Sequence, residues 1–455
     1  MYRLRQLTVM LGDLVFLYIA LYLALFLRYL KVPEAERFLT LLSPISQLFL
    51  LFIVIFFVVG LYDLGRLKNN WLTYQKIILG CLVWLGLGII YFYLHPTLQI
   101  SPKTILLILA SLNLGLVSLW RYIHNRHVSK NLWQIGVLFV GVTPETSEII
   151  DFIKSQPERG YFVLGIIPLN TNTAEKVGVP TFHSLSEVDK KQTPGLIVIA
   201  PNLEKSDELV KNLYAMIFQH VSIFDLEQFY EELMKRIPPF TFSQTWFLSN
   251  LREQHKHIYD RFRIVTDYLI ALVIGTVFVA TFPLVALLLK IFSPGPLFFT
   301  QERIGRMGQK FRIIKYRSMK VLGEHGSAEI SGPVYAKEKD DRITGIGKIL
   351  RLTRLDEIPQ FINILKGEMA IIGPRPERPE FVEELTKQMP YYALRHMVKP
   401  GLTGWAQLQK SYYGTVEENL RKLEYDLYYI KNRSLLLDIV ILLRTLNVIF
   451  GLKGR

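Results

Sequence analysis

Two adjacent carboxylates, Asp356 and Glu357, stand in the segment LDEIPQFINILKGEMAIIGPRP, which covers residues 355–376. Pro359 favours the first turn of a helix, and Gly367 favours its end. Both acids would then lie at the helix N-terminus, where the helix dipole stabilises negative charge. Capping is the simple interpretation of such a pair, so the neighbouring residues must decide between capping and chemistry.

Arginines flank the acid pair on both sides. Arg351 and Arg354 precede it, and Arg375 and Arg378 follow it in a proline-rich loop. Arginine suits bidentate phosphate recognition, and hard divalent ions such as Mg²⁺ are held by one or two carboxylates together with phosphate oxygens. A carboxylate can also act as a covalent nucleophile. This combination predicts a site for a diphosphate and Mg²⁺.

The composition indicates a membrane protein of several parts. The chain has 455 residues, of which 50% are hydrophobic, and its mean hydropathy is +0.26. The formal net charge of +14 predicts anionic partners. Because the basic residues border apolar segments, membrane flanks explain this charge better than nucleic-acid binding. The single cysteine, Cys81, excludes an intramolecular disulfide.

Four apolar segments near the N-terminus are long enough to span a bilayer. They cover residues 7–27, 38–62, 77–94 and 104–120. Each is close to the roughly 20 residues that a spanning helix needs. Lysine and arginine are concentrated before the first segment, in the second loop and after the fourth, which predicts that both ends of this bundle are cytoplasmic. Asp13 and Asp267 lie near helix ends, where an interfacial position is expected.

A fifth apolar run, residues 268–289, has basic residues on both sides. A helix that crosses the membrane once cannot place both flanks in the cytoplasm. Pro283 removes a backbone hydrogen bond and bends a helix. We therefore expect a re-entrant hairpin over residues 264–292, broken at Pro283. A plain fifth span, which would send the last third of the chain outside, is the alternative.

The remaining segments read as α/β. Apolar strands alternate with helical stretches over residues 131–236, which predicts a parallel, Rossmann-like sheet. Only Gly141 follows the first strand there, so a dinucleotide fingerprint lacks its later glycines and a structural or regulatory role is favoured. The predicted organisation is a four-helix bundle (1–130), this degenerate module, a linker (237–263) and a small α/β catalytic domain (264–455). Residues 435–450 suit a helix lying on the bilayer surface.

Two other functions fit parts of this organisation. A non-catalytic scaffold or regulator of polysaccharide export would use the module at 131–236 as a sensor. This function predicts a broken acid pair or lost arginines, whereas the chain keeps both. A membrane-fused nucleotide-sugar-modifying enzyme needs a glycine-rich turn and a Tyr-x-x-x-Lys pair, and residues 131–250 contain neither.

Three motifs in order carry a family resemblance. They are SPGPLFFTQERIGRMGQKFRIIKYRSM, RLTRLDEIPQFINILKGEMAIIGPRP and KPGLTGWAQ, within residues 264–450. This region resembles the catalytic domain of the polyprenyl-phosphate sugar-phosphate transferases, the monotopic phosphoglycosyl transferases that begin bacterial exopolysaccharide, O-antigen and capsule synthesis. The whole chain resembles the large members of that family.

The resemblance implies a reaction and its residues. Asp356 would attack the sugar-bearing phosphate of a UDP-sugar, expel UMP and hold a covalent phosphosugar, which undecaprenyl phosphate then accepts. Glu357 would bind Mg²⁺, and Arg351 and Arg375 match positions that handle phosphate. Four further candidates for phosphate binding, any of which could instead pair with surface acids or lipid head groups, are Arg378, Lys315, Arg317 and Arg303.

The resemblance also implies membrane lipids as partners, a homodimer, and a place in the bacterial inner membrane with the catalytic domain on the cytoplasmic face. Two positions depart from the family pattern. Phe282 precedes Pro283 where many relatives have serine, so a hydroxyl that could stabilise the bend is absent. Ser411 stands where many relatives have arginine, which leaves the sugar open.

Overall fold

The computed structural model describes residues 2–62, 71–94, 103–128, 134–168, 178–189, 194–201, 207–218, 221–239, 247, 250, 256–293, 295–320, 340–389, 391–409 and 415–450. The chain forms two compact units, Met1–Phe229 and Tyr230–Arg455. Ser411 lies outside the described residues.

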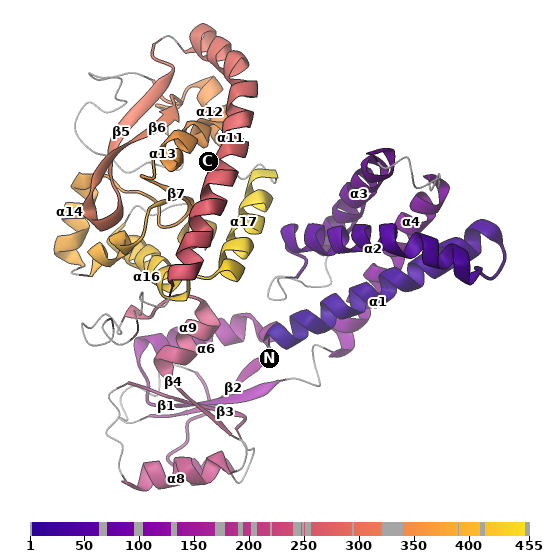
Figure 1. Ribbon diagram of the computed structural model, residues 1–455. Helices are drawn as coiled ribbons and strands as arrows, with labels where there is room; N and C mark the ends of the chain where they lie inside the picture. The colour runs from indigo at the N-terminus through magenta and orange to yellow at the C-terminus, as the bar shows by residue number, and fades with distance from the viewer. Residues whose placement is uncertain are drawn as a thin grey trace. The chain divides into compact units, whose positions relative to one another are not determined.

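The first unit begins with four apolar helices, each of which contains a stretch long and apolar enough to cross a membrane. They are α1 (Tyr2–Tyr29), α2 (Ala35–Val58), α3 (Trp71–Leu94) and α4 (Lys103–Ile123). Helix α1 packs along α4, and α3 contacts both α2 and α4 (Figure 1). Their shared core includes Leu21, Phe52, Trp84 and Leu109. The four predicted segments are therefore helical and pack together.

A buried ion pair joins α1 to α4. Asp13 is fully buried, and its two carboxylate oxygens accept hydrogen bonds from Arg121 Nε (3.2 Å) and Nη2 (2.5 Å). The Tyr62 hydroxyl donates a further bond of 2.8 Å to Asp13. A partner 108 residues away in sequence therefore satisfies the Asp13 carboxylate inside the protein, and the interfacial position of Asp13 in the membrane stays a prediction.

The same unit continues as a parallel sheet of four strands in the order β2-β1-β3-β4. The strands are β1 (Ile135–Val140), β2 (Tyr161–Ile167), β3 (Leu196–Ile199) and β4 (Ser222–Asp225). Helices α6 (Pro144–Ser155), α7 (Leu185–Asp189), α8 (Asp207–Ile217) and α9 (Leu226–Met234) connect or follow them. Thr143 caps α6 directly after β1, in a turn whose only glycine is Gly141. The predicted parallel α/β pattern is present here.

The second unit is built on α11 (His257–Phe292), a helix of 36 residues that begins before the predicted start at 264. Pro283 lies inside this helix, which continues through it. The helix is therefore not interrupted at Pro283, and the bend and the re-entrant course stay predictions. A proline removes only one hydrogen bond, here to the carbonyl of Val279, and in the same stretch the Thr281 hydroxyl bonds the Val277 carbonyl at 2.8 Å. The membrane face on which the helix ends stays a prediction.

A β-hairpin packs on the C-terminal half of α11. It consists of β5 (Phe298–Ile304) and β6 (Lys310–Tyr316), joined by the turn η8 (Arg306–Gly308). Phe282 stacks on Phe298 with ring centroids 6.1 Å apart, and Phe298 stacks on Tyr316 at 5.5 Å. Phe282, which departs from the family pattern, therefore packs α11 against the β5–β6 hairpin.

Short elements complete the second unit. They are α12 (Gly345–Leu352), η10 (Leu355–Gln360), α13 (Phe361–Leu365), β7 (Ala370–Ile372), α14 (Pro379–Gln388), η11 (Tyr392–Met397), β8 (Gly401–Thr403), α15 (Trp405–Gln409), α16 (Val416–Asn432) and α17 (Leu435–Phe450). Strands β7 and β8 pair in parallel. Helix α17 lies beside the N-terminal half of α11 (Figure 1).

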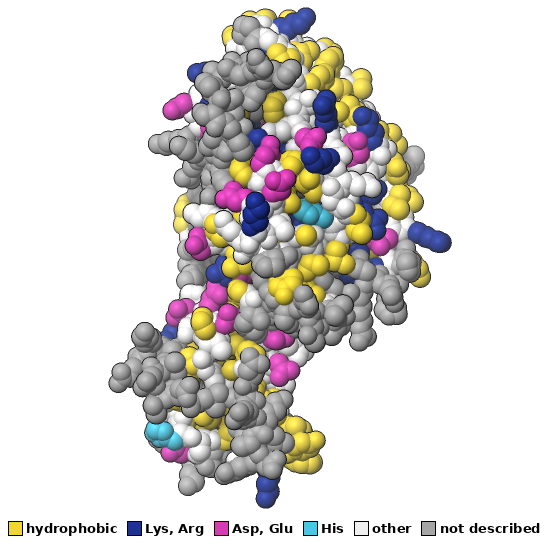
Figure 2. Space-filling view, turned by 90° about the vertical axis from the view of Figure 1, so that its left-hand side faces the viewer, with side chains coloured by type: hydrophobic (Ala, Val, Ile, Leu, Met, Phe, Trp, Pro, Cys, Tyr) yellow, Lys and Arg dark blue, Asp and Glu magenta, His cyan; other side chains and the backbone are white. Residues whose placement is uncertain are grey.

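Apolar side chains gather on one part of the surface that Figure 2 shows. Figure 2 shows acidic and basic side chains intermixed on the face toward the viewer, with hydrophobic side chains gathered along the right-hand edge of the upper part. Helix α11 exposes many apolar side chains, Leu272, Val273 and Val279 among them. A surface of this kind fits a lipid environment better than water.

Candidate functional site

The acid pair lies inside a tight helical turn. Asp356 and Glu357 belong to the 3₁₀-helix η10, which leads directly into α13. Arg354, just before η10, has a φ of 61°, a left-handed conformation that a non-glycine residue adopts at a cost. This turn redirects the chain after α12, and both acids end up buried, with 7% and 8% of their surfaces exposed. Capping of an exposed helix end does not require such burial.

Three cations from different parts of the unit hold Glu357. Lys315 Nζ lies 2.8 Å and Arg375 Nη2 3.2 Å from Oε1, and Arg354 Nη1 lies 3.5 Å from Oε2. Burial alone would raise the pKa of Glu357, but these three positive charges outweigh burial and hold the pKa well below its usual range. Glu357 is therefore an anion in contact with three cations.

Asp356 has a different environment. Its Oδ1 atom is buried and has no hydrogen-bond partner among the described residues. Burial raises the pKa of Asp356 to about 6, and the adjacent Glu357 charge acts in the same direction, while Lys315 and Arg351 oppose the shift. A carboxylate oxygen without a partner, beside positive charges that would attract an anion, has the properties of a nucleophile.

A small cleft opens next to the acid pair. It is lined by Arg303, Ile313, Lys315, Gln360, Arg375, Pro376 and Gly401. Burial lowers the pKa of Lys315, and it lowers that of Arg303 to about 10. No carboxylate is among these lining residues. Three partly buried cations gathered around one cleft form a site for an anion rich in oxygen, such as a phosphoryl group.

A buried charge network fixes the loop that carries Arg375. Arg395 donates hydrogen bonds to the backbone oxygen of Arg375 (3.0 Å) and to Asp426 (2.8 Å). Lys422 forms an ion pair with Glu377, whose backbone oxygen accepts a bond of 2.9 Å from Ile304 N. The sequence analysis missed these residues. The available signal was that Lys422 and Asp426 share a helical face with the buried Leu423 and Leu427.

The structure brings only some of the predicted phosphate ligands into the cleft. Lys315, Arg375 and Arg303 line it. Arg351 lies next to the cleft, bonds Ser318 Oγ at 3.0 Å and contributes positive charge at Asp356.

The two other candidates have different partners. Arg317 donates to the carbonyl of Ser293 and so holds the end of α11. Arg378 stands at the start of α14, 3.4 Å from Glu380. Neither residue lines the cleft.

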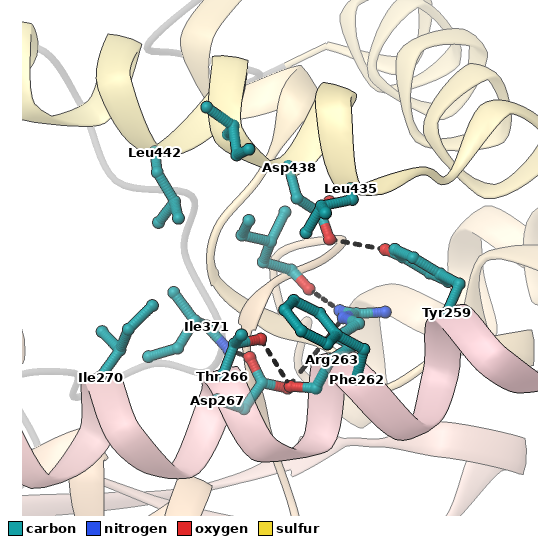
Figure 3. Close-up of a pocket in the computed structure, with 12 residues that line it drawn as sticks. Tyr259, Phe262, Arg263, Thr266, Asp267, Ile270, Ile371, Leu435, Asp438 and Leu442 are labelled. Carbon is teal, nitrogen blue, oxygen red and sulfur yellow. Dashed lines mark hydrogen bonds and ion pairs between the residues drawn. The ribbon is translucent and has the colours of Figure 1, made fainter.

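A separate cavity of about 300 Å³ lies between α11, β7 and α17. Figure 3 shows its polar residues directed toward one another across the gap between the helices. Tyr259 and Tyr429 donate to Asp438, and Asp267 accepts from Ile371 N at 3.0 Å. Asp267 thus links α11 to β7 through this hydrogen bond. These groups join α11 to α17 and β7. Among the described residues that line this cavity, Arg263 is the one lysine or arginine, whereas three such residues line the cleft.

Comparisons with known proteins identify the family of this chain. Residues 258–451 match the family described as "Bacterial sugar transferase". A "UDP-N-acetylgalactosamine-undecaprenyl-phosphate N-acetylgalactosaminephosphotransferase" of Aeromonas hydrophila is 37% identical over 230 residues, which are 50% of this chain and 52% of that protein. The chain belongs to this family of sugar-phosphate transferases.

Two further relatives are each called "UDP-glucose:undecaprenyl-phosphate glucose-1-phosphate transferase". The protein of Escherichia coli (strain K12) is 42% identical over 163 residues, 35% of this chain and 34% of its own length. The protein of Caulobacter vibrioides is 38% identical over 183 residues, 40% of this chain and 67% of its own length. The match thus covers from a third to two thirds of the length of these three relatives. Their names differ in the sugar.

Proposed function

We propose that this chain transfers a sugar 1-phosphate from a UDP-sugar to undecaprenyl phosphate, giving undecaprenyl-diphosphate-sugar and UMP. The observation that carries the proposal is the unpartnered Oδ1 of the buried Asp356, next to a cleft lined by three cations. The names of the relatives, which specify undecaprenyl phosphate as acceptor, support it. The product would begin an exopolysaccharide, O-antigen or capsule polymer.

In the first step, an oxygen of Asp356 attacks the sugar-bearing phosphorus. An O–P bond forms, the bond from phosphorus to the bridging oxygen of the diphosphate breaks, and UMP leaves with the electron pair. Arg375, Lys315 and Arg303 line the cleft and would stabilise the charge on the phosphoryl oxygens. Because the pKa of Asp356 is about 6, this carboxyl is an anion at neutral pH and more basic than an ordinary aspartate.

In the second step, a phosphate oxygen of the lipid attacks the same phosphorus. The bond to Asp356 breaks, and the carboxylate is regenerated. The negative charge of Glu357 keeps Lys315 and Arg375 in place during both steps. One cleft can serve both steps because the leaving group and the incoming group are both phosphates.

The residues present fit Mg²⁺ bound together with the donor. In the described part of the chain, no three acidic, histidine or cysteine side chains gather as a metal site. Glu357, which contacts Lys315, Arg375 and Arg354, would supply the carboxylate that Mg²⁺ takes when phosphates provide most of its other ligands. Bound there, Mg²⁺ would neutralise charge on the diphosphate.

The position of the site suits a reaction between a soluble and a lipid substrate. Helix α11 carries exposed apolar side chains along its length, and a stacked aromatic cluster joins it to β5 and β6. We propose that it holds the catalytic domain at the cytoplasmic face of the bacterial inner membrane. The homodimer stays a prediction, which mass measurement in nanodiscs can check.

The experiment that tests the proposal is UMP release in nanodiscs. UDP-glucose, UDP-galactose and their N-acetyl forms are compared with and without undecaprenyl phosphate and Mg²⁺. We expect UMP release from at least one donor, formation of a lipid-linked sugar only with the acceptor, and loss of both on chelation. Absence of UMP from every donor, with the protein folded, would reject the reaction class.

A further inference from the structure

Gln360 is a buried side chain in the cleft that the proposed chemistry has not used. It is the last residue of η10, and only 2% of its surface is exposed. Its Nε2 atom is buried and has no hydrogen-bond partner among the described residues. An amide nitrogen carries two N–H donors, and leaving them buried without a partner destabilises the fold. A bound group that supplies an acceptor would remove this cost.

The surroundings of Gln360 define that acceptor. Arg303, Lys315 and Arg375 line the same cleft, and these side chains are donors that carry positive charge. Pro376, another lining residue, has a carbonyl oxygen that already accepts from Arg303 at 3.2 Å. The ligand must therefore be anionic and must present several oxygens, as a phosphoryl group does.

The position of Gln360 relative to the acid pair indicates which phosphoryl group this is. Gln360 follows Asp356 by four residues within one short 3₁₀-helix, so both side chains are carried by the same element. Asn363, in the next turn, bonds Ile314 N at 3.1 Å and the Arg312 carbonyl at 2.8 Å, which ties this element to β6. The amide and the proposed nucleophile are thus held in a constant relation.

We propose that the Gln360 amide donates a hydrogen bond to a non-bridging oxygen of the sugar-bearing phosphate while it is transferred to and from Asp356. This inference rests on the proposed function. No bond to Gln360 forms or breaks, and no proton leaves it. A neutral donor keeps the same charge in both steps, and it stabilises the transferring group without adding a fourth cation that would hold the phosphate product.

The test compares Gln360→Met, which keeps the length and removes the donors, with Gln360→Glu, which keeps the shape and replaces donors by a negative charge. Gln388→Met, at the exposed end of α14, is the matched control. Loss of one transition-state donor typically lowers kcat about 10²–10³-fold. We expect such a loss in Gln360→Met with the donor KM changed less than about threefold, a larger loss in Gln360→Glu, and wild-type kinetics in the control.

A second measurement separates contact with substrate from a structural role. Each diastereomer of the UDP-sugar with sulfur at one non-bridging oxygen of the sugar-bearing phosphate is assayed. We expect the wild type to discriminate against the isomer whose sulfur faces the amide, and Gln360→Met to lose that discrimination. A variant with unchanged discrimination, or with kcat within about threefold of wild type, overturns the inference. If the wild type itself releases no UMP, the proposed function has failed instead.

Discussion

Two buried aspartates in this molecule have opposite surroundings. Asp13 in α1 has both oxygens bonded, to Arg121 and Tyr62, and no surface exposed. Asp356 in η10 is almost as buried, yet one of its oxygens has no partner among the described residues. The neighbouring Glu357 takes the cations that could have satisfied it.

The difference teaches how to separate a structural acid from a reactive one. In the helical bundle, one carboxylate meets one guanidinium, and the charges balance. Around the pair in the second unit, the basic groups that act on the two carboxylates are Lys315, Arg351, Arg354 and Arg375. This surplus of positive charge favours the binding of an anion. Burial alone does not distinguish the two sites; the balance of partners does.

The largest effect should come from removing the nucleophile. Asp356→Asn keeps the volume and removes the attacking anion, so we expect UMP release and the covalent phosphosugar to fall by about 10⁴-fold or more. Intact-mass measurement after a quench with UDP-sugar detects the adduct. An adduct that persists in this variant would mean that another residue is the nucleophile.

Breaking the structural pair should affect stability and leave the chemistry alone. Arg121→Met leaves Asp13 buried without its cation, which typically destabilises a protein by about 3–5 kcal/mol. Thermal unfolding in nanodiscs should show this loss, and Asp13→Leu combined with Arg121→Met should recover much of it. The rate per folded molecule should match the wild type. If the rate per folded molecule fell in these variants, the distinction between the structural and the reactive acid would be contradicted.

The pH profile tests the cause of the raised pKa. With the pKa of Asp356 at about 6, the attacking carboxylate is protonated below that pH. The rate constant kcat/KM for UMP release should therefore decline about tenfold per pH unit below 6 and level off above it. Glu357→Gln removes a repelling negative charge, so the acid limb should move to lower pH in addition to any loss of rate. A limb at the same pH would assign it to another group.

The smallest effect is expected at Arg378. This arginine pairs with the exposed Glu380 and does not line the cleft, so Arg378→Ala should change kcat/KM by less than about threefold. Arg375→Ala is the comparison. It removes a cation from both Glu357 and the cleft and should lower kcat/KM far more than Arg378→Ala does. Equal losses would show that the cleft extends to α14 when substrate is bound.

Much of the fold was predictable because its signals are local. The apolar runs predicted helices α1 to α4 and α11, since length and hydropathy are read from consecutive residues. Alternation of strands and helices predicted the parallel sheet of the first unit. The helix continues through Pro283, where Phe282 stacks on Phe298, and this contact with a distant strand cannot be read from neighbouring residues.

The sequence by itself determined the chemical types at the site: an adjacent acid pair, arginines on both sides of it, and an apolar helix before them. Only the tertiary structure decided that Glu357 contacts three cations while Asp356 Oδ1 has no partner among the described residues, that Arg395 supports Arg375, and that Gln360 faces the same cleft. The physical reason is that each of these facts depends on which groups meet after distant segments pack. Partners such as Lys315 and Glu357 are separated by 42 residues, and no pattern of neighbouring residues encodes their distance.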